Sequence, residues 1–225
     1  MKTLGIFVKQ PIAGRVKTRL ADDIGSQQAA TIYGSFIEDI VARFRSCADR
    51  RLLCYAPAEG TAYFQELAGA AYELWQQPEA ELGERLRSFF ADQLDDTTAR
   101  VIVIGSDSPT LPREYVERGF DLLDDADCVV GPATDGGYYL IGMRGRLLPI
   151  FAGIAWSSAA VLEQTVSRIE ACGAKLALLP VWYDVDTLDD LRLLRGHVRA
   201  LRRTQSPLNL DAVARTLERL TDDEI

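Results

Sequence analysis

Short apolar segments alternate with segments of helical periodicity along almost the whole chain of 225 residues. The first apolar run, residues 3–8, is rich in β-branched and aromatic residues and stops at Lys9-Gln10-Pro11, which predicts a buried strand followed by a loop. From Gln27 to Phe44 apolar residues recur at helical spacing, and a second strand is predicted at residues 51–56. Strands separated by helices in this way imply a largely parallel sheet covered on both faces.

The same alternation continues toward the C-terminus. Further strands are predicted at 71–75, 101–105, 127–131, 138–143 and 175–185, and further helices at 62–67, 83–94, 112–123, 157–172 and 188–203, with Ser157 as the N-cap of its helix. We therefore expect one domain over residues 1–225, with a helical tail from about residue 205. Its predicted fold class is α/β, a Rossmann-like three-layer α/β/α arrangement around a mostly parallel central sheet.

Charge and residue usage exclude several classes of protein. The net charge is −8 and the pI about 4.8, so we expect no general attraction to nucleic acid or to an anionic membrane. The apolar run at the N-terminus is too short for a signal peptide or a membrane span, which favours a cytoplasmic protein. One histidine and four scattered cysteines disfavour a zinc site, a disulfide framework or a histidine-dependent hydrolase. Chemistry must then use carboxylates, cations or a metal, while the oligomeric state stays open.

A basic loop follows the first predicted strand. Five cations and no acid fall between Met1 and Ala21, although the protein as a whole is acidic. The loop has no Walker A spacing, but its backbone N–H groups and cations suit a diphosphate or triphosphate. The alternative is a solvated basic loop, and the absence of acids favours phosphate. The candidate phosphate ligands are Lys9, Gly14, Arg15, Lys17 and Arg19, together with Ser106 after a later strand.

Two acidic segments are candidates for a metal site. The strand at 101–105 delivers Asp107 at its carboxyl end, where a magnesium-binding carboxylate belongs, although Asp107 could instead set a turn or cap a helix. Asp184 and Asp186 occupy alternate positions and would share one face of an extended backbone, so a cation is a reasonable counterpart for their charges. The competing role is capping of the next helix by Asp186 or Thr187.

A glycine-rich segment lies between two further predicted strands. Asp135-Gly136-Gly137 permits close approach of a ligand to the backbone, but it is also an ordinary hairpin signal. Tyr138 and Trp156 are candidates to stack on a base or a sugar, although buried aromatic residues more often pack in a core.

In this order the motifs resemble a family of GT-A-type nucleotide-diphospho-sugar transferases, the radical-SAM/selenodomain-associated transferase 1 family. The resemblance spans nearly the whole chain. It is carried by KxPxxGRVKTRL at 9–20, LGER at 82–85, GSDSP at 105–109, DGGYYLIG at 135–142, WS at 156–157 and DVDT at 184–187. The sequence is also similar to phospholactate guanylyltransferases and to molybdenum-cofactor nucleotidyltransferases, which share the cationic first loop.

The resemblance implies that Lys17 and Arg19 meet nucleotide phosphates, that Asp107 holds a metal ion and that Asp186 completes that site. The sequence departs from the family pattern at Leu188, where proline is common, and at Ser158, where threonine is expected.

The expected function is a magnesium-dependent transfer reaction, with manganese as a substitute for magnesium. Nucleotidyl transfer from a nucleoside triphosphate to a phosphorylated acceptor needs no base, whereas glycosyl transfer from a nucleotide sugar with inversion needs a carboxylate base, for which Asp135 is the candidate. Lys17, Asp107 and Asp135 are the predicted catalytic residues. The rival interpretations are a non-catalytic nucleotide-binding protein and a metal-dependent phosphohydrolase. The expected partners are a nucleoside triphosphate or a nucleotide sugar and a small-molecule acceptor, with no nucleic acid and no membrane span.

Overall fold

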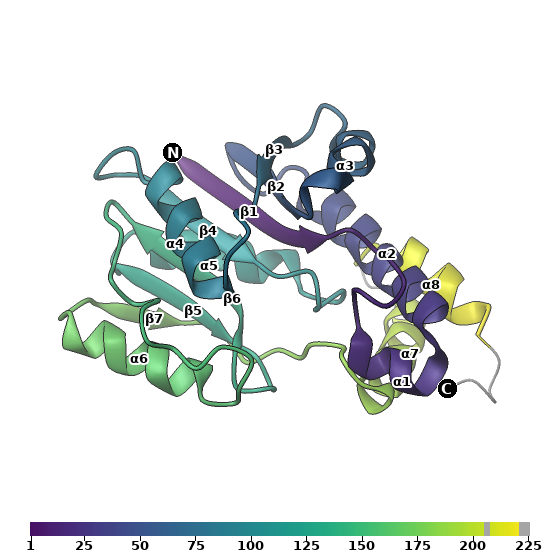
Figure 1. The fold of residues 1–225 in the computed structure, drawn as a ribbon. Coiled ribbons are helices and arrows are strands. Elements are labelled where there is room, and N and C mark those ends of the chain that lie inside the picture. The colour runs from purple at the N-terminus through teal and green to yellow at the C-terminus, as the bar shows by residue number, and fades with distance from the viewer. Residues whose placement is uncertain (205–207, 221–225) are drawn as a thin grey trace.

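The computed structural model describes residues 1–204 and 208–220, and its elements follow the predicted alternation. The sheet contains β1 (Lys2–Lys9), β2 (Arg50–Ala56), β3 (Glu73–Gln76), β4 (Arg100–Ile104), β5 (Cys128–Pro132), β6 (Tyr138–Arg144) and β7 (Leu176–Leu178). The helices are α1 (Thr18–Ile24), α2 (Ser26–Phe44), α3 (Thr61–Ala68), α4 (Leu82–Gln93), α5 (Arg113–Leu122), α6 (Val161–Ala171), α7 (Leu188–Arg203) and α8 (Asp211–Glu218), with a short 3-10 turn, η1 (Ala58–Gly60) (Figure 1).

The strands form one mixed sheet in the order β3-β2-β1-β4-β6-β5-β7. Strand β6 runs antiparallel to β4 and β5, and the other neighbouring strands are parallel. Only residues 133–137 connect β5 to β6, which is too short for a crossover and therefore requires an antiparallel pair. The predicted Rossmann-like three-layer fold with a mostly parallel sheet is confirmed.

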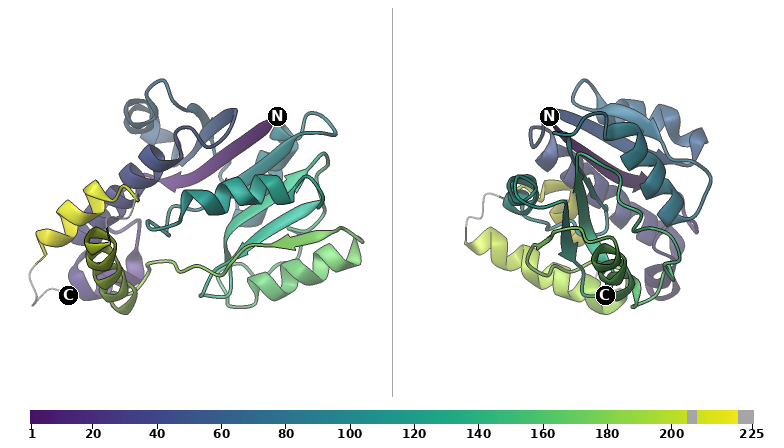
Figure 2. Two further views of the ribbon diagram at one scale, coloured as in Figure 1. Left: turned by 180° about the vertical axis from the view of Figure 1, so that it is seen from behind. Right: turned by 90° about the vertical axis from the view of Figure 1, so that its left-hand side faces the viewer.

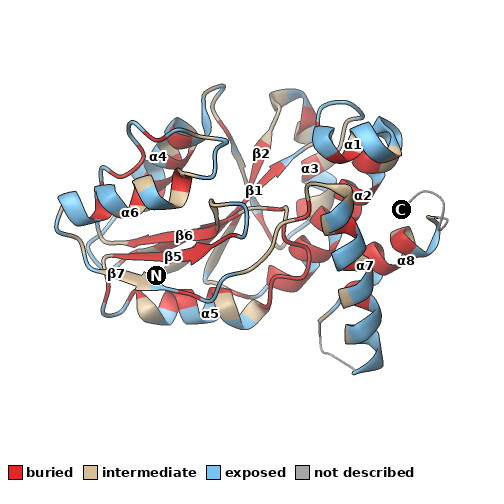
Figure 3. Ribbon diagram, turned by 90° about the horizontal axis from the view of Figure 1, so that it is seen from below, coloured by how far each residue is buried: buried red, intermediate tan, exposed pale blue. Residues whose placement is uncertain are grey.

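The two faces of the sheet bury different side chains because successive strand residues point to opposite sides. Leu4, Ile6 and Val8 of β1 join a core that includes residues of α2, α5 and α7, whereas Phe7 joins a second core with residues of α4 and α6. Figure 3 shows α4 and α6 on one side of the sheet and α5 on the other. Helices α1, α7 and α8 gather beyond the carboxyl end of β1 (Figure 1), and the view from behind in Figure 2 shows the same group at one end of the molecule.

Three local predictions are corrected by the structure. The basic loop is shorter than residues 9–20, because its last residues already form the start of α1. Ser157 is not an N-cap: it has a left-handed φ of 63°, and α6 begins only at Val161 after a turn in which the Ser158 hydroxyl donates to the Ala155 carbonyl. The strand predicted at 175–185 is limited to β7 and one bridge, since Pro180 has no N–H to continue a ladder.

Helix α8 is fastened to α2 by two buried charged side chains. The Asp39 carboxylate accepts hydrogen bonds from the backbone N–H groups of Ala212 (3.0 Å) and Val213 (2.8 Å), and so caps a helix far away in sequence. Arg43 donates to the carbonyl oxygens of Pro109 (2.6 Å) and Asn209 (2.7 Å). Through Arg43, α2 ties the loop after β4 to the segment before α8.

The predicted beginning of the tail at 205–207 lies outside the described residues, and the prediction of a single domain stays a prediction. Among the described helices, none combines the length and the apolar character that a bilayer crossing requires.

Replacing Asp39 by alanine is expected to lower the free energy of unfolding by about 2 kcal/mol, because two N–H groups at a buried helix end lose their acceptor. Urea unfolding at pH 7 measures the change. Asp211→Ala is the matched control, since it removes one acid from the exposed first turn of the same helix. Equal losses in the two variants would contradict the capping role.

Candidate functional site

The ammonium group of Lys17 lies between two carboxylates that come from distant segments. Its Nζ donates to Oδ1 of Asp107 and, at 2.9 Å, to Oδ1 of Asp186. Arg19 donates from Nη2 to the other oxygen of Asp186 at 2.6 Å. The Lys17 side chain is 3% exposed and the Asp107 side chain 49%, so the cluster has a buried cation and an accessible carboxylate. The sequence-predicted residues Lys17, Arg19, Asp107 and Asp186 are therefore brought together.

The backbone of the basic loop positions Lys17. Gly14 has a φ of 77°, a left-handed conformation that glycine adopts without a steric penalty. Lys17 itself has a φ of 48° at the N-cap of α1, which is uncommon and costly for a residue with a Cβ. This conformation turns the Lys17 side chain inward, where the ion pairs offset the backbone cost, while Arg19 starts from the first turn of α1.

A backbone hydrogen bond joins the two acidic segments. The N–H of Val185 donates to the carbonyl of Asp107 at 2.9 Å, and Val185 is fully buried between Asp184 and Asp186. Thr187, not Asp186, caps α7, and its hydroxyl accepts from the N–H of Asp190 in a capping box. Asp186 is thus left for the cations. Asp107 does not cap α5 either, because the N-cap there is Pro112 and no side chain bonds to it.

Electrostatics reinforces this cluster. Burial by itself would lower the pKa of Lys17, but the neighbouring charges of Asp107 and Asp186 and their hydrogen bonds raise it well above its ordinary value. Burial would raise the pKa of Asp186, and the charge of Lys17 and its hydrogen bond outweigh that effect and lower the pKa. Lys17 and Asp186 are therefore ionised near neutral pH.

Asp184 differs from its neighbour Asp186. Its Oδ1 accepts a hydrogen bond from the Ser108 hydroxyl at 2.5 Å. Burial raises the pKa of Asp184 to about 7; Asp107 and Asp135 add to that rise, which the Ser108 bond and Lys17 oppose. Asp184 lies beside the Lys17 cluster without an ion pair to Lys17 in the described structure, and its predicted role as a metal ligand stays a prediction.

Tyr33 supports the cluster and was expected only as part of the apolar stripe of a helix. Its hydroxyl accepts from the N–H of Lys9 at 3.1 Å and bonds to the Ser106 hydroxyl at 2.7 Å. The Lys17 Nζ lies 5.6 Å from the centre of its ring, and that of Phe36 is 5.8 Å away. A tyrosine in a buried stripe needs a hydrogen-bond partner for its hydroxyl, and this need was the feature of the sequence that could have pointed to a role for Tyr33.

The residues present fit a magnesium ion that also binds a phosphate. Asp107 and Asp186 converge on one cation, Lys17, which places carboxylate oxygens of both residues around the same point. Within residues 1–204 and 208–220 no group of three or more acidic, histidine or cysteine side chains could hold a metal ion. Magnesium typically takes one or two protein carboxylates and completes its shell with water and substrate phosphates.

The glycine-rich turn is held by hydrogen bonds and close packing, and its predicted role in substrate binding stays a prediction. The Asp135 carboxylate is exposed and accepts from the N–H of Gly137 at 2.8 Å. Gly136 has a φ of 89°, and a Cβ there would lie 2.3 Å from the carbonyl oxygen of Ala159, so this glycine is needed for packing. The N–H of Thr134 donates to the Trp182 carbonyl at 3.0 Å, which holds the turn next to the Asp184 segment.

Three side chains that were predicted to bind a ligand make contacts within the protein. The Ser106 side chain is buried and its hydroxyl donates to the carbonyl of Phe7 at 3.0 Å, while its predicted phosphate contact stays a prediction. Tyr138 is partly buried against the second core, with its hydroxyl buried, and its predicted stacking on a ligand stays a prediction. Trp156 lies against the start of α4, since a Cβ on Gly83 would come 2.5 Å from its Nε1.

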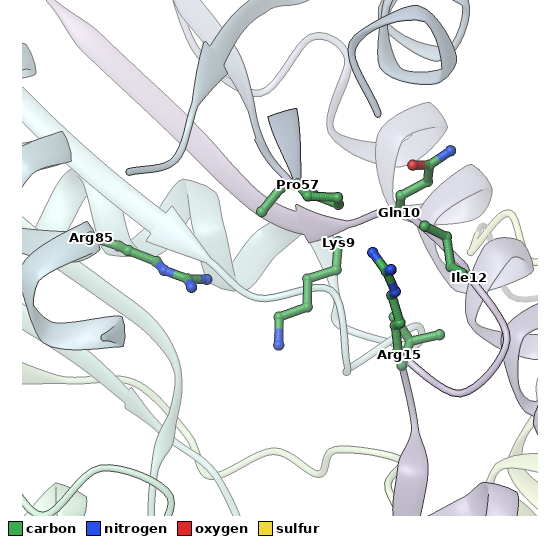
Figure 4. A pocket seen from close by; sticks show the side chains of 8 residues that line it. Lys9, Gln10, Ile12, Arg15, Pro57 and Arg85 are labelled. Carbon is green, nitrogen blue, oxygen red and sulfur yellow. The ribbon is translucent and has the colours of Figure 1, made fainter. Parts of the chain in front are cut away.

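Lys9 and Arg15 face a separate hollow. It has a volume of about 220 Å³ and is also lined by Arg85, from the LGER segment of α4 (Figure 4). Lys17 is not among its lining residues. The predicted phosphate-binding residues are thus divided between two places.

Comparison with known proteins gives both a family and a fold. Residues 41–158, just over half of the chain, match the model of a family described as an uncharacterized protein conserved in bacteria (DUF2064). A protein from Desulfovibrio desulfuricans G20, provisionally described as a nucleotide-diphospho-sugar transferase, is 33% identical, with a TM-score of 0.86 over 96% of this chain and 95% of that one. A comparison with curated protein sequences finds no match.

More distant structures share the fold alone. 4-Diphosphocytidyl-2C-methyl-D-erythritol synthase is 14% identical, with a TM-score of 0.58 over 88% of this chain and 97% of the other. The synthetase for CMP:2-keto-3-deoxy-manno-octonic acid, solved with CTP, is also 14% identical, with a TM-score of 0.53 over 91% of this chain and 99% of the other. The fold is therefore that of nucleotide-diphospho-sugar transferases and nucleotidyltransferases.

Without metal, the contribution of Asp184 to the stability of the protein is expected to fall as the pH rises from about 4 to about 7. Unfolded, Asp184 titrates near its ordinary pKa of 3.8, whereas in the folded protein its pKa is about 7. The folded state binds one more proton in this window, so the free energy of unfolding falls with rising pH. At roughly 1.4 kcal/mol per pKa unit, reduced because the side chain is partly exposed, Asp184→Asn should remove about 2 kcal/mol of this loss.

Urea unfolding in EDTA at pH 4 and pH 8 measures this difference. Asp189→Asn, an exposed acid in the first turn of α7, is the control and should leave the pH dependence unchanged. A wild-type slope that Asp184→Asn does not reduce would show that Asp184 titrates normally.

Proposed function

The chain belongs to the DUF2064 family of uncharacterized bacterial proteins, and from this premise we propose that it is a magnesium-dependent transferase with a nucleotide donor. The observation that carries the proposal is the buried Lys17 ammonium between Asp107 and Asp186, with Arg19 on the far oxygen of Asp186. The cluster lies beyond the carboxyl ends of β1 and β4, where sheets of this type bind their ligands. We also propose that the protein is a member of the radical-SAM/selenodomain-associated transferase 1 family, which its motifs resemble.

The proposed reaction is nucleotidyl transfer from a nucleoside triphosphate. An ionised phosphate of the acceptor attacks the α-phosphorus, the bond from that phosphorus to the bridging oxygen breaks, and pyrophosphate leaves. Lys17 and Arg19 neutralise charge that accumulates on the leaving phosphates. No general base is required, since the attacking phosphate is already ionised.

Asp107 and Asp186 would hold the magnesium ion, which when bound supplies charge neutralisation at the phosphates. Asp107 is the more accessible of the two, with 49% of its side chain exposed against 27% for Asp186. The Lys17 ammonium lies between the two carboxylates. We infer that Lys17 turns toward the nucleotide phosphates when a magnesium ion binds between the two carboxylates.

Glycosyl transfer from a nucleotide sugar is the second candidate, because the protein from Desulfovibrio desulfuricans G20 carries that provisional description. In this reaction an acceptor hydroxyl attacks the sugar carbon and a nucleoside diphosphate leaves. Asp135 is the carboxylate proposed as base, and it is exposed and electrostatically coupled to Asp184. The hydrogen bond from the Gly137 N–H to Asp135 would have to be compatible with that role.

The two reactions release different products. Incubation with each nucleoside triphosphate or nucleotide sugar, magnesium and a mixture of small acceptors should release pyrophosphate in the first case and nucleoside diphosphate in the second. Asp107→Ala should lower the rate by about 100-fold or more, since a charge-stabilising group is lost at the reacting phosphates. Asp189→Ala is the control, because it removes an exposed acid of α7.

Free phosphate as the sole product would support a phosphohydrolase instead. Nucleotide binding without any turnover would support a regulatory protein. Wild-type rates in Asp107→Ala, with the fold intact by circular dichroism, would refute the assigned role of this carboxylate.

Replacing Lys17 is expected to affect metal binding in opposite directions without and with a nucleotide. Without nucleotide, Lys17→Met should bind Mn²⁺ about tenfold more tightly than the wild type, because the ammonium no longer competes for the carboxylates. With a nucleoside triphosphate present, the variant should bind the metal–nucleotide complex more weakly. Electron paramagnetic resonance of free Mn²⁺ measures both, and Lys175→Met, an exposed lysine after α6, is the control. Equal Mn²⁺ affinity in Lys17→Met and the wild type would contradict the competition.

A further inference from the structure

The hollow beside β1 gathers three cations from two parts of the chain. Lys9 ends β1, Arg15 lies in the basic loop and Arg85 lies in the first turn of α4. Figure 4 shows the Arg85 guanidinium extending toward Lys9 from one side and Arg15 rising on the other, so that Lys9 stands between them. The rest of the lining is Gln10 and the apolar residues Ile12, Val16, Ala56 and Pro57.

These three positive charges are not compensated by acids. The lining contains no aspartate or glutamate, although the protein carries a net charge of −8. None of the ion pairs formed among the described residues includes Lys9, Arg15 or Arg85. Like charges that share a small hollow repel one another, and an anion relieves that repulsion. A neutral group such as a nucleobase would leave it in place.

Arg85 is held in position before any ligand arrives. Its Nε donates to the carbonyl of Ala80 at 2.5 Å, and its Nη1 lies 3.5 Å from Oε1 of Gln77. Gln77 is buried and donates from Nε2 to the carbonyls of Val8 (3.2 Å) and Cys54 (2.6 Å), so it ties together the ends of β1 and β2. The bond to Ala80 therefore orients the guanidinium, and further N–H groups are left for a ligand.

We propose that Lys9, Arg15 and Arg85 form an anion site that binds a phosphate group, separate from the cluster of Lys17, Asp107 and Asp186. The apolar wall accommodates the organic part that carries the phosphate, and an arginine that presents several N–H groups suits a phosphate better than a single point charge does. The identity of that phosphate rests on the proposed function, in which the donor and the acceptor are both phosphorylated. The LGER segment thereby acquires a binding role through Arg85.

The experiment measures phosphate and pyrophosphate binding by isothermal titration calorimetry on the full chain in EDTA, where no metal can assist. Arg85→Gln should weaken binding about tenfold or more, because a charged hydrogen-bonding partner is lost. Arg87→Gln is the matched control: it removes the same charge two residues further along α4, from an exposed side chain that pairs with Glu84. It should change the affinity less than twofold. Lys9→Gln, at an exposed position, provides a second variant should Arg85→Gln unfold.

Titration with a nucleoside triphosphate identifies the source of the phosphate. If Arg85→Gln weakens triphosphate binding as much as pyrophosphate binding, the site holds phosphates of the donor. If it weakens only phosphate and pyrophosphate binding, the site holds the acceptor. Both results support an anion site.

Two results would overturn the proposal: equal loss of affinity in Arg85→Gln and Arg87→Gln, or no phosphate binding by the wild type at millimolar concentration. Failure of the proposed function has a different signature, because turnover that is insensitive to Asp107→Ala leaves the calorimetric result on Arg85 intact.

Discussion

The placement of one buried ammonium group between two carboxylates governs the rest of this site. Without Lys17, Asp107 and Asp186 would repel each other at close range, and without them a lysine that is only 3% exposed would tend to lose its proton. The cost is visible in the backbone, where Lys17 adopts a left-handed conformation that a residue with a Cβ normally avoids. Such an arrangement persists because the loop after β1, the loop after β4 and the segment before α7 constrain it together.

The long helix α2 does more than cover the sheet. Tyr33, Asp39 and Arg43 lie in its buried stripe, and each forms hydrogen bonds to a segment that is distant in sequence. Tyr33 reaches Lys9 and Ser106 beneath the Lys17 cluster, and Arg43 reaches the carbonyl of Pro109 in the loop that carries Asp107. Buried polar groups are costly unless they are hydrogen-bonded, so these contacts fix the loops relative to the helix.

The acidic protein presents two local concentrations of positive charge at one edge of its sheet. Lys17 and Arg19 are paired with carboxylates, whereas no ion pair within the described chain involves Lys9, Arg15 or Arg85. In the cluster of Lys17 and Arg19 the cations are balanced by carboxylates, which suits a site where a metal ion and a phosphate bind together. In the hollow lined by Lys9, Arg15 and Arg85 an anion alone would balance the positive charge. A transferase with two phosphorylated reactants would use both the charge-balanced cluster and the uncompensated cationic hollow.

The sequence by itself determined the alternation of strands and helices, the three-layer fold and the segments that supply Lys17, Arg19, Asp107 and Asp186, because periodicity, turn residues and charge are local properties of the chain. The start of α1, the end of β7 and the role of Ser157 escaped it, since helix ends depend on a few competing hydrogen bonds. Only the tertiary structure decided that Ser106 and the Tyr138 hydroxyl are buried, that Thr187 and not Asp186 caps α7, and that Arg85 joins Lys9 and Arg15. Those outcomes depend on which side chains meet across distant segments, and burial and hydrogen-bond geometry exist only after the chain has folded.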